Sequence, residues 1–307
     1  MAEGEKLTNA KPIPGILPLA GDPNGELSYD IITQIDPSAR KQTLLVLING
    51  FQRNKLDFRA LRKRLHDACP GLITAALDNR GVGETRTNAS FTLADMAGDV
   101  CSLVNTIHAR FGQMDCILLG ISMGGMIAQL AAAQLLASSN SSLKGLILAS
   151  TTGGGTLRVR SELPLYAPGT RDTSGWAEDY DSHKQRMLRY FGSRFRKSSP
   201  LLIDAMAKNV FKTASQENEQ SRAAAQFQAT RHFDAAEALE HIKGSKLPTL
   251  VVCGEEDEIM PLQNSVNLHA LLSGQSTLVT YPETGHLLLI EEPENFASAI
   301  ASFVSQF

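Results

Sequence analysis

Residues 116–129 read CILLGISMGGMIAQ, and the fold of the chain is decided here. An apolar run typical of a buried strand stops at Gly120, and a turn of small residues leads through Ser122 into a helical pattern. Gly-x-Ser-x-Gly between a strand and a helix is a nucleophile elbow, a sharp turn that holds the serine hydroxyl above the edge of the sheet. A dinucleotide-binding turn is the competing interpretation. It is weaker, because Ser122 stands where a pyrophosphate requires glycine.

Strand-like and helix-like segments alternate around this stretch. Apolar runs typical of strands buried in a parallel sheet lie at 43–48 and 72–77, and further strand-like runs lie at 146–149, 249–253 and 276–281. Two more strand-like runs, 16–19 and 27–35, are joined by Asp22-Pro23-Asn24-Gly25, a turn that favours an antiparallel hairpin. The alternation predicts an α/β fold with a mostly parallel, doubly wound sheet.

The alternation breaks at residues 151–156, TTGGGT. From there to about Gly244 the sequence is helical and polar, with scattered aromatic side chains that we interpret as a small separate core. We expect residues 1–152 and 245–307 to form the α/β core and residues 153–244 to form an inserted helical cap. The three glycines at 153–155 fit a flexible hinge and a fixed loop equally well.

Composition narrows the possible partners. The 307 residues are 43% hydrophobic with a formal net charge of −3, which is ordinary for a globular protein and gives no general attraction to nucleic acid or anionic membranes. No apolar run approaches the length of a spanning helix, and the polar N-terminus does not resemble a secretory signal, so we expect a cytoplasmic protein. The four scattered cysteines show no metal spacing. We expect a small-molecule substrate, no cofactor and no metal; the sequence does not indicate an oligomeric state.

A serine hydroxyl becomes a good nucleophile when a base removes its proton, and a carboxylate is needed to orient that base. The acidic run Glu255-Glu256-Asp257-Glu258 directly follows the strand at 249–253, and His286 directly follows the strand at 276–281. Spacing alone does not choose among the four acids, and Glu256 is the main competitor of Asp257. The other six histidines lie in helical stretches, and of these His232 has a place in the predicted cap from which it can reach a pocket.

These residues resemble the α/β-hydrolase superfamily over essentially the whole chain apart from the cap. The resemblance is carried by Gly120-Ile-Ser122-Met-Gly124-Gly125, by residues 78–83 (DNRGVG), by Gly254-x-x-Asp257-x-x-x-Pro261 and by Gly285-His286. It implies the α/β-hydrolase fold and a catalytic triad of Ser122, Asp257 and His286.

The resemblance also implies an oxyanion hole made by the backbone N–H groups of Phe51 and Met123. The sequence departs from the family pattern at Asn49, where a histidine commonly precedes glycine. Because the expected donors are backbone groups, the hole survives this change, and Asn49 either reshapes the loop or offers its amide to the substrate. We expect Asn49, Gly50 and His232 to contact the substrate.

The leading functional interpretation is a serine hydrolase that cleaves a small-molecule ester, thioester or lactone through an acyl-enzyme. A lyase or cyclase that uses His286 for proton transfer stays open. A C–C bond hydrolase is disfavoured by Ile121 and by the loop 51–54 (FQRN), and a catalytically dead relative is disfavoured by the complete triad.

The basic residues of the cap fit either an acidic substrate or a solvated face; they are Arg158, Arg160, Arg186, Arg189, Arg194, Arg196 and Lys197.

Overall fold

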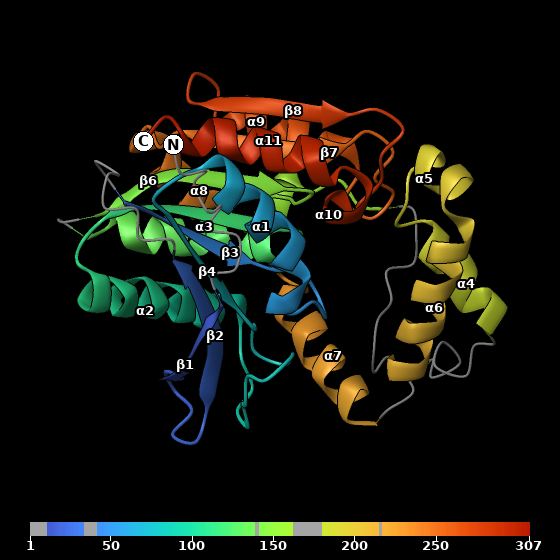
Figure 1. Ribbon diagram of the computed structural model, residues 1–307, viewed down its shortest axis with the longest axis horizontal. Coiled ribbons are helices and arrows are strands. Elements are labelled where there is room, and N and C mark those ends of the chain that lie inside the picture. The colour runs from blue at the N-terminus through green and yellow to red at the C-terminus, as the bar shows by residue number, and fades with distance from the viewer. Residues whose placement is uncertain (1–10, 34–41, 139–140, 162–179, 215–216) are drawn as a thin grey trace, which may run out of the picture.

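The computed structural model describes residues 11–33, 42–138, 141–161, 180–214 and 217–307. These residues form an eight-stranded sheet in the order β1-β2-β4-β3-β5-β6-β7-β8 (Figure 1). The strands are β1 (Ile13–Pro18), β2 (Glu26–Thr33), β3 (Thr43–Ile48), β4 (Leu72–Leu77), β5 (Asp115–Ile121), β6 (Leu143–Ala149), β7 (Thr249–Gly254) and β8 (Ser276–Tyr281). Strand β2 pairs antiparallel with β1 and β4, and all other pairs are parallel. The predicted mostly parallel sheet is confirmed.

Some sequence predictions differ from these strand bounds, and others lie outside the described residues. The first strand begins at Ile13, three residues before the expected position, because residues 13–18 pair fully with β2. Residues 34 and 35 of the predicted strand 27–35, the N-terminal residues 1–10 and residues 162–179 of the predicted cap lie outside the described residues. Within the described part, no helix is long and apolar enough to cross a membrane.

Helices cover both faces of the sheet, and each face has its own apolar core. Helices α2 (Leu93–Phe111), α3 (Met123–Leu136) and α8 (Ala236–Gly244) cover one face; α1 (Arg59–Ala68) and α11 (Pro293–Val304) cover the other. Successive residues of β3 alternate between the cores: Leu44 and Val46 point to the first, and Leu45 and Leu47 to the second. Burial on both faces explains why the strand sequence is continuously apolar.

The helices between β6 and α8 stand apart from these layers. They are α4 (Tyr180–Leu188), α5 (Ser193–Ser198), α6 (Pro200–Ala214) and α7 (Glu217–Thr230), and Figure 1 shows α4, α5 and α6 to one side of the sheet with α7 leading back to it. The predicted cap 153–244 includes α8, yet the Leu239 and Ile242 side chains of this helix are buried in the core beside α3. We therefore propose that the cap ends before α8.

The glycines at the start of this insertion are closely packed. Ala235 donates its N–H to the Gly153 carbonyl at 2.9 Å, and Gly155 donates to the Phe233 carbonyl at 3.2 Å. Gly154 has a φ of 71°, and a Cβ atom on it would lie 2.3 Å from the Phe233 carbonyl oxygen. These contacts favour the fixed loop over the hinge.

Replacing Gly154 with alanine is expected to destabilise the protein by about 2 kcal/mol or more, because alanine is strained at positive φ and its methyl group would meet backbone. Urea unfolding measures this loss. Gly98→Ala is the control, since a Cβ at that position in α2 meets nothing within 4 Å and alanine favours a helix. Equal stability of the Gly154→Ala and natural proteins would show that the loop rearranges freely.

A buried polar cluster ties α1 to β2 and β4. The Arg62 side chain pairs with Asp30 and donates from Nε to the Thr74 hydroxyl at 2.9 Å. One turn later, His66 Nε2 lies 3.0 Å from the same hydroxyl. Because this hydroxyl accepts from Arg62, its own hydrogen is available to the lone pair of a neutral imidazole. Burial, followed by the Arg62 charge, lowers the pKa of His66 to about 4.

We expect His66 to make stability depend on pH. Between its ordinary pKa of 6.5 and its folded-state pKa of about 4, His66 is protonated in the unfolded chain and neutral in the folded chain. Stability is therefore lost as the pH falls through this range. The loss is at most about 3 kcal/mol. His66→Gln should flatten this part of the pH profile in urea unfolding, whereas His241→Gln, an exposed change in α8, should not. Equal slopes in the natural and His66→Gln proteins would contradict the assignment.

Candidate active site

Ser122 occupies a sharp turn between β5 and α3. Its φ is 56°, a left-handed conformation that is strained for a residue with a side chain, and its N–H donates to the Ala149 carbonyl at 2.9 Å. The glycines around it are required by close packing: a Cβ on Gly124 would lie 2.1 Å from the Ile48 carbonyl oxygen, and one on Gly120 would lie 2.2 Å from the Gly124 carbonyl oxygen. Tertiary packing thus holds the serine in its strained turn at the carboxyl end of β5.

His286 and Asp257 meet at the same edge of the sheet, because they follow the parallel strands β8 and β7. His286 Nδ1 lies 2.8 Å from Asp257 Oδ2. The other carboxylate oxygen, Oδ1, accepts the N–H groups of Ile259 at 2.9 Å and Met260 at 2.8 Å. Both side chains of the pair are buried, so the carboxylate is fixed and shielded from water.

The neighbouring acids point elsewhere. Glu256, the main competitor in the sequence, accepts the N–H of Ser193 at 2.6 Å and its hydroxyl at 2.9 Å. Glu255 accepts the Thr280 hydroxyl at 2.7 Å, and Glu258 pairs with Arg189 at 2.9 Å. Of the four acids, Asp257 is the one that contacts His286.

The loop after β3 brings backbone N–H groups beside Ser122. A Cβ on Gly50 would lie 3.1 Å from the Ser122 Cβ, so this loop and the serine turn are in close contact. Among the described residues, the N–H groups of Phe51 and Met123 have no acceptor. Two unused donors next to a serine hydroxyl are available to an oxygen that develops negative charge.

Asn49 lines the same cavity, but its amide is engaged within the loop. Its Nδ2 donates to the Asn54 carbonyl at 2.9 Å, and its Oδ1 accepts the N–H of Gly50 at 2.9 Å. Of the two roles considered for Asn49, this geometry favours shaping of the loop.

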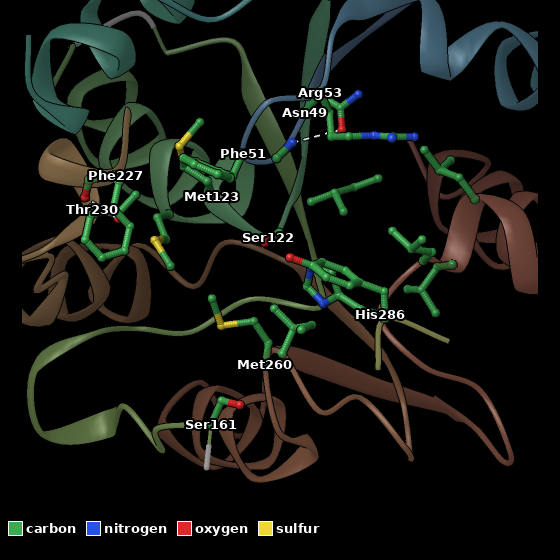
Figure 2. A pocket seen from close by; sticks show the side chains of 18 of the residues that line it. Asn49, Phe51, Arg53, Ser122, Met123, Ser161, Phe227, Thr230, Met260 and His286 are labelled. Carbon is green, nitrogen blue, oxygen red and sulfur yellow. Dashed lines mark hydrogen bonds between the residues drawn. The ribbon is translucent and has the colours of Figure 1, made fainter. Parts of the chain in front are cut away.

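Figure 2 shows the cavity into which Ser122 and His286 project. Its volume is about 710 Å³, within the range of pockets that hold small molecules. Gly50, Phe51 and Met123 contribute from the sheet side, and His232 contributes from the loop after α7. The described structure thus brings every predicted site residue except Asp257 to one cavity, and Asp257 lies directly behind His286.

Two positioning contacts were not predicted. The half-buried Glu291 carboxylate, in α10 (Leu288–Glu291), accepts the N–H groups of Gly285 at 3.1 Å and Leu287 at 3.2 Å, on either side of His286. It also accepts the N–H of Gly192, between α4 and α5, at 2.7 Å. Burial raises the pKa of Glu291. The Glu291 side chain therefore joins the histidine loop to the separate helices.

Gln226 makes the second unpredicted contact. This fully buried residue of α7 accepts the N–H of Gln52 at 2.9 Å and donates to the Arg80 carbonyl at 2.8 Å. It therefore anchors α7 to the loop that carries Phe51 and to the 78–83 loop. Neither contact has a local sequence signal, although Glu291 stands close to His286 in the chain.

Comparisons with known proteins agree on one family. A family model described as alpha/beta hydrolase fold matches residues 43–293. The chain is 26% identical over 264 residues to the uncharacterized hydrolase YugF of Bacillus subtilis, covering 86% of this chain and 90% of YugF.

Solved structures show the same fold. A thermophilic esterase from Thermogutta terrifontis superposes with a TM-score of 0.68 at 23% identity, covering 96% of this chain and 98% of the esterase. A meta-cleavage product hydrolase from Pseudomonas fluorescens superposes with a TM-score of 0.68 at 17% identity, covering 95% and 98%. At these identities the two structures establish the shared fold alone.

Proposed function

We propose that this chain, which belongs to the alpha/beta hydrolase fold family and is a hydrolase, cleaves a small-molecule ester, thioester or lactone through an acyl-enzyme on Ser122. The observation that carries this proposal is the buried Asp257–His286 hydrogen bond of 2.8 Å behind a cavity that also contains Ser122. A carboxylate, an imidazole and a strained serine hydroxyl are the groups that acyl transfer requires.

In the first half of the reaction, Ser122 Oγ attacks the carbonyl carbon while His286 Nε2 takes the hydroxyl proton. Asp257 accepts the Nδ1 hydrogen, which leaves Nε2 with a free lone pair and stabilises the imidazolium that forms. The carbonyl oxygen becomes negative and accepts the N–H groups of Phe51 and Met123. His286 then protonates the leaving alcohol or thiol as its bond to the carbonyl carbon breaks.

In the second half, water attacks the acyl carbon and gives a proton to His286. The bond to Ser122 breaks, the proton returns to the serine oxygen, and the free acid leaves. One water is consumed, and the enzyme ends in its starting state.

We propose further that α4 to α7 act as a cap over this cavity. Tyr190, Phe227, Thr230 and His232 line it from these helices and the loops beside them. Residues that close a cavity from a separate layer exclude water from the reaction and select the substrate. We also propose a cytoplasmic location, which the four free cysteines support, because disulfides are rare there.

Labelling with a fluorophosphonate tests the proposal. We expect one covalent adduct by intact-mass measurement, mapped to the peptide that carries Ser122, and its loss in Ser122→Ala. Turnover of short-chain esters and thioesters should disappear on labelling. An unlabelled, folded protein that turns over no ester, thioester or lactone would contradict the proposal.

The same scaffold also fits a lyase or cyclase in which His286 transfers a proton and Ser122 only holds the substrate. It fits cleavage of a carbon–carbon bond as well, and the meta-cleavage product hydrolase shares this fold. Product analysis separates these reactions. A lyase or cyclase adds no water to the substrate, whereas both hydrolyses add one; ester or thioester cleavage then releases an alcohol or thiol, and carbon–carbon cleavage releases a product with a new C–H bond.

A further inference from the structure

The charged side chains that line the cavity are of one sign. They include four arginines and, among the described residues, no aspartate or glutamate; the arginines are Arg53, Arg158, Arg160 and Arg231. Arg53 has a counter-charge outside the cavity, because its Nε lies 3.0 Å from Asp57. Apolar side chains make up much of the remaining wall, including Met126, Phe227 and Met260.

Arg158 and Arg160 are held in place by a fixed backbone. Val159 between them donates its N–H to Asn264 Oδ1 at 2.8 Å and accepts Asn264 Nδ2 at 2.9 Å. Asn264 is completely buried in α9 (Leu262–Leu271). Arg158 has extended backbone, with φ −77° and ψ 118°. Alternate side chains of an extended segment point to the same side, which explains why both arginines line the cavity while Val159 faces outward.

These two cations lack a counter-charge within the described part of the chain. No carboxylate there lies within ion-pair distance of either guanidinium. Burial, followed by the charge of Arg160, lowers the pKa of Arg158. Two like charges that a rigid backbone holds together would both gain from an anion between them.

Other basic residues of the insertion behave differently. Arg189 pairs with Glu258, Arg194 with Glu292, and Arg196 lies 3.5 Å from Glu258. These pairs join α5 and the end of α4 to the loop after β7 and to the junction of α10 and α11. These arginines and the cavity arginines therefore fall into two groups: one group pairs with carboxylates and holds helices in place, and the other lines the cavity.

We propose that Arg158 and Arg160 form an anion subsite and that the substrate is an anionic ester, one that carries a carboxylate away from the scissile carbonyl. This rests on the proposed function, since it names the substrate class of the same cavity. The planar guanidinium forks match a carboxylate in bidentate geometry, and the apolar wall suits the carbon chain between the two groups. The carboxylate binds at the arginines while Ser122 reaches the ester carbonyl.

Matched esters test this subsite. The monoethyl esters of succinic, glutaric and adipic acid are compared with the same esters carrying a primary amide in place of the carboxylate, and ethanol release is followed. At the best chain length we expect kcat/KM to favour the acid over the amide by about 10- to 100-fold. The preference should shrink as salt is raised to about 0.5 M, because charged contacts at a partly open site are screened.

Variants assign the preference to these residues. The double variant Arg158→Gln, Arg160→Gln should bring the acid-to-amide ratio close to unity. Arg59→Gln, which removes an exposed charge of α1 outside the cavity, should keep the ratio of the natural protein. Equal kcat/KM for acid and amide at every chain length, or a preference that survives in the double variant, would overturn the subsite while leaving the hydrolase proposal intact.

A binding measurement judges the subsite without turnover. Glutarate should raise the melting temperature of the natural protein more than glutaramide does, and this difference should vanish in the double variant. If no ester is cleaved, the proposed function fails and this measurement still decides the subsite. Glutarate that stabilises no more than glutaramide would overturn it.

Discussion

Ser122→Ala is expected to lower kcat on the natural substrate by about 10⁴- to 10⁶-fold. Ser122, in its strained turn, lines the same cavity as His286, Phe51 and Met123, and Asp257 lies behind His286. Without it no acyl bond can form, and only binding and the backbone donors remain to assist water. Steady-state kinetics give the rate, and intact-mass measurement of the unmutated enzyme with substrate should show the acyl adduct.

The same variant separates the two reaction classes. In a lyase or cyclase the hydroxyl supplies at most a hydrogen bond, and its loss would cost about 10²- to 10³-fold. Ser102→Ala is the matched control, because that serine is exposed on α2. Circular dichroism should show both variants folded. A modest loss without an adduct would rule out the acyl-enzyme.

Asp257→Asn is expected to lower kcat by about 10³- to 10⁴-fold with the fold retained. One carboxylate oxygen accepts from His286 and the other accepts two backbone N–H groups, so every contact of this side chain needs an acceptor. An amide has one acceptor oxygen. If its NH₂ faces His286, the imidazole must present a lone pair at Nδ1, and Nε2 then carries the hydrogen and cannot act as a base.

Glu256→Gln is the control for this experiment. It makes the same chemical change next to Asp257, but Glu256 contacts Ser193 instead of the histidine. We expect less than about 10-fold loss of kcat, as its contacts are exposed hydrogen bonds of modest energy. A larger loss from Glu256→Gln than from Asp257→Asn would show that the acid is assigned to the wrong residue.

Local patterns in the sequence were enough to predict the α/β core. Continuous apolar runs mark strands buried on both faces, as at residues 43–48, and small residues mark the turn at Ser122. Both signals are local, because they depend on which side chains a strand can bury and which backbone angles a turn requires. The positions of the serine, the acidic run and His286 at strand ends follow from these patterns alone.

Such local patterns could not predict the contacts between distant segments. The choice of Asp257 over Glu256 depends on where each carboxylate points once two strands lie side by side. The joining of loops and helices by Glu291 and Gln226 depends on segments far apart in the chain. Neighbouring residues in a sequence share their local pattern, and only packing assigns them different partners.

The spacing of a few neighbouring residues was enough to predict the sheet, the sharp serine turn and the set of candidate acids and bases, because each of these features depends on local side-chain patterns. Packing between distant segments places α8 in the core, surrounds Gly154 closely and brings Arg158 and Arg160 to a cavity. A cluster of basic residues has the same sequence pattern whether its charges are paired or unpaired. Whether each basic side chain forms an ion pair depends on which carboxylates the fold brings within reach, and those come from other parts of the chain.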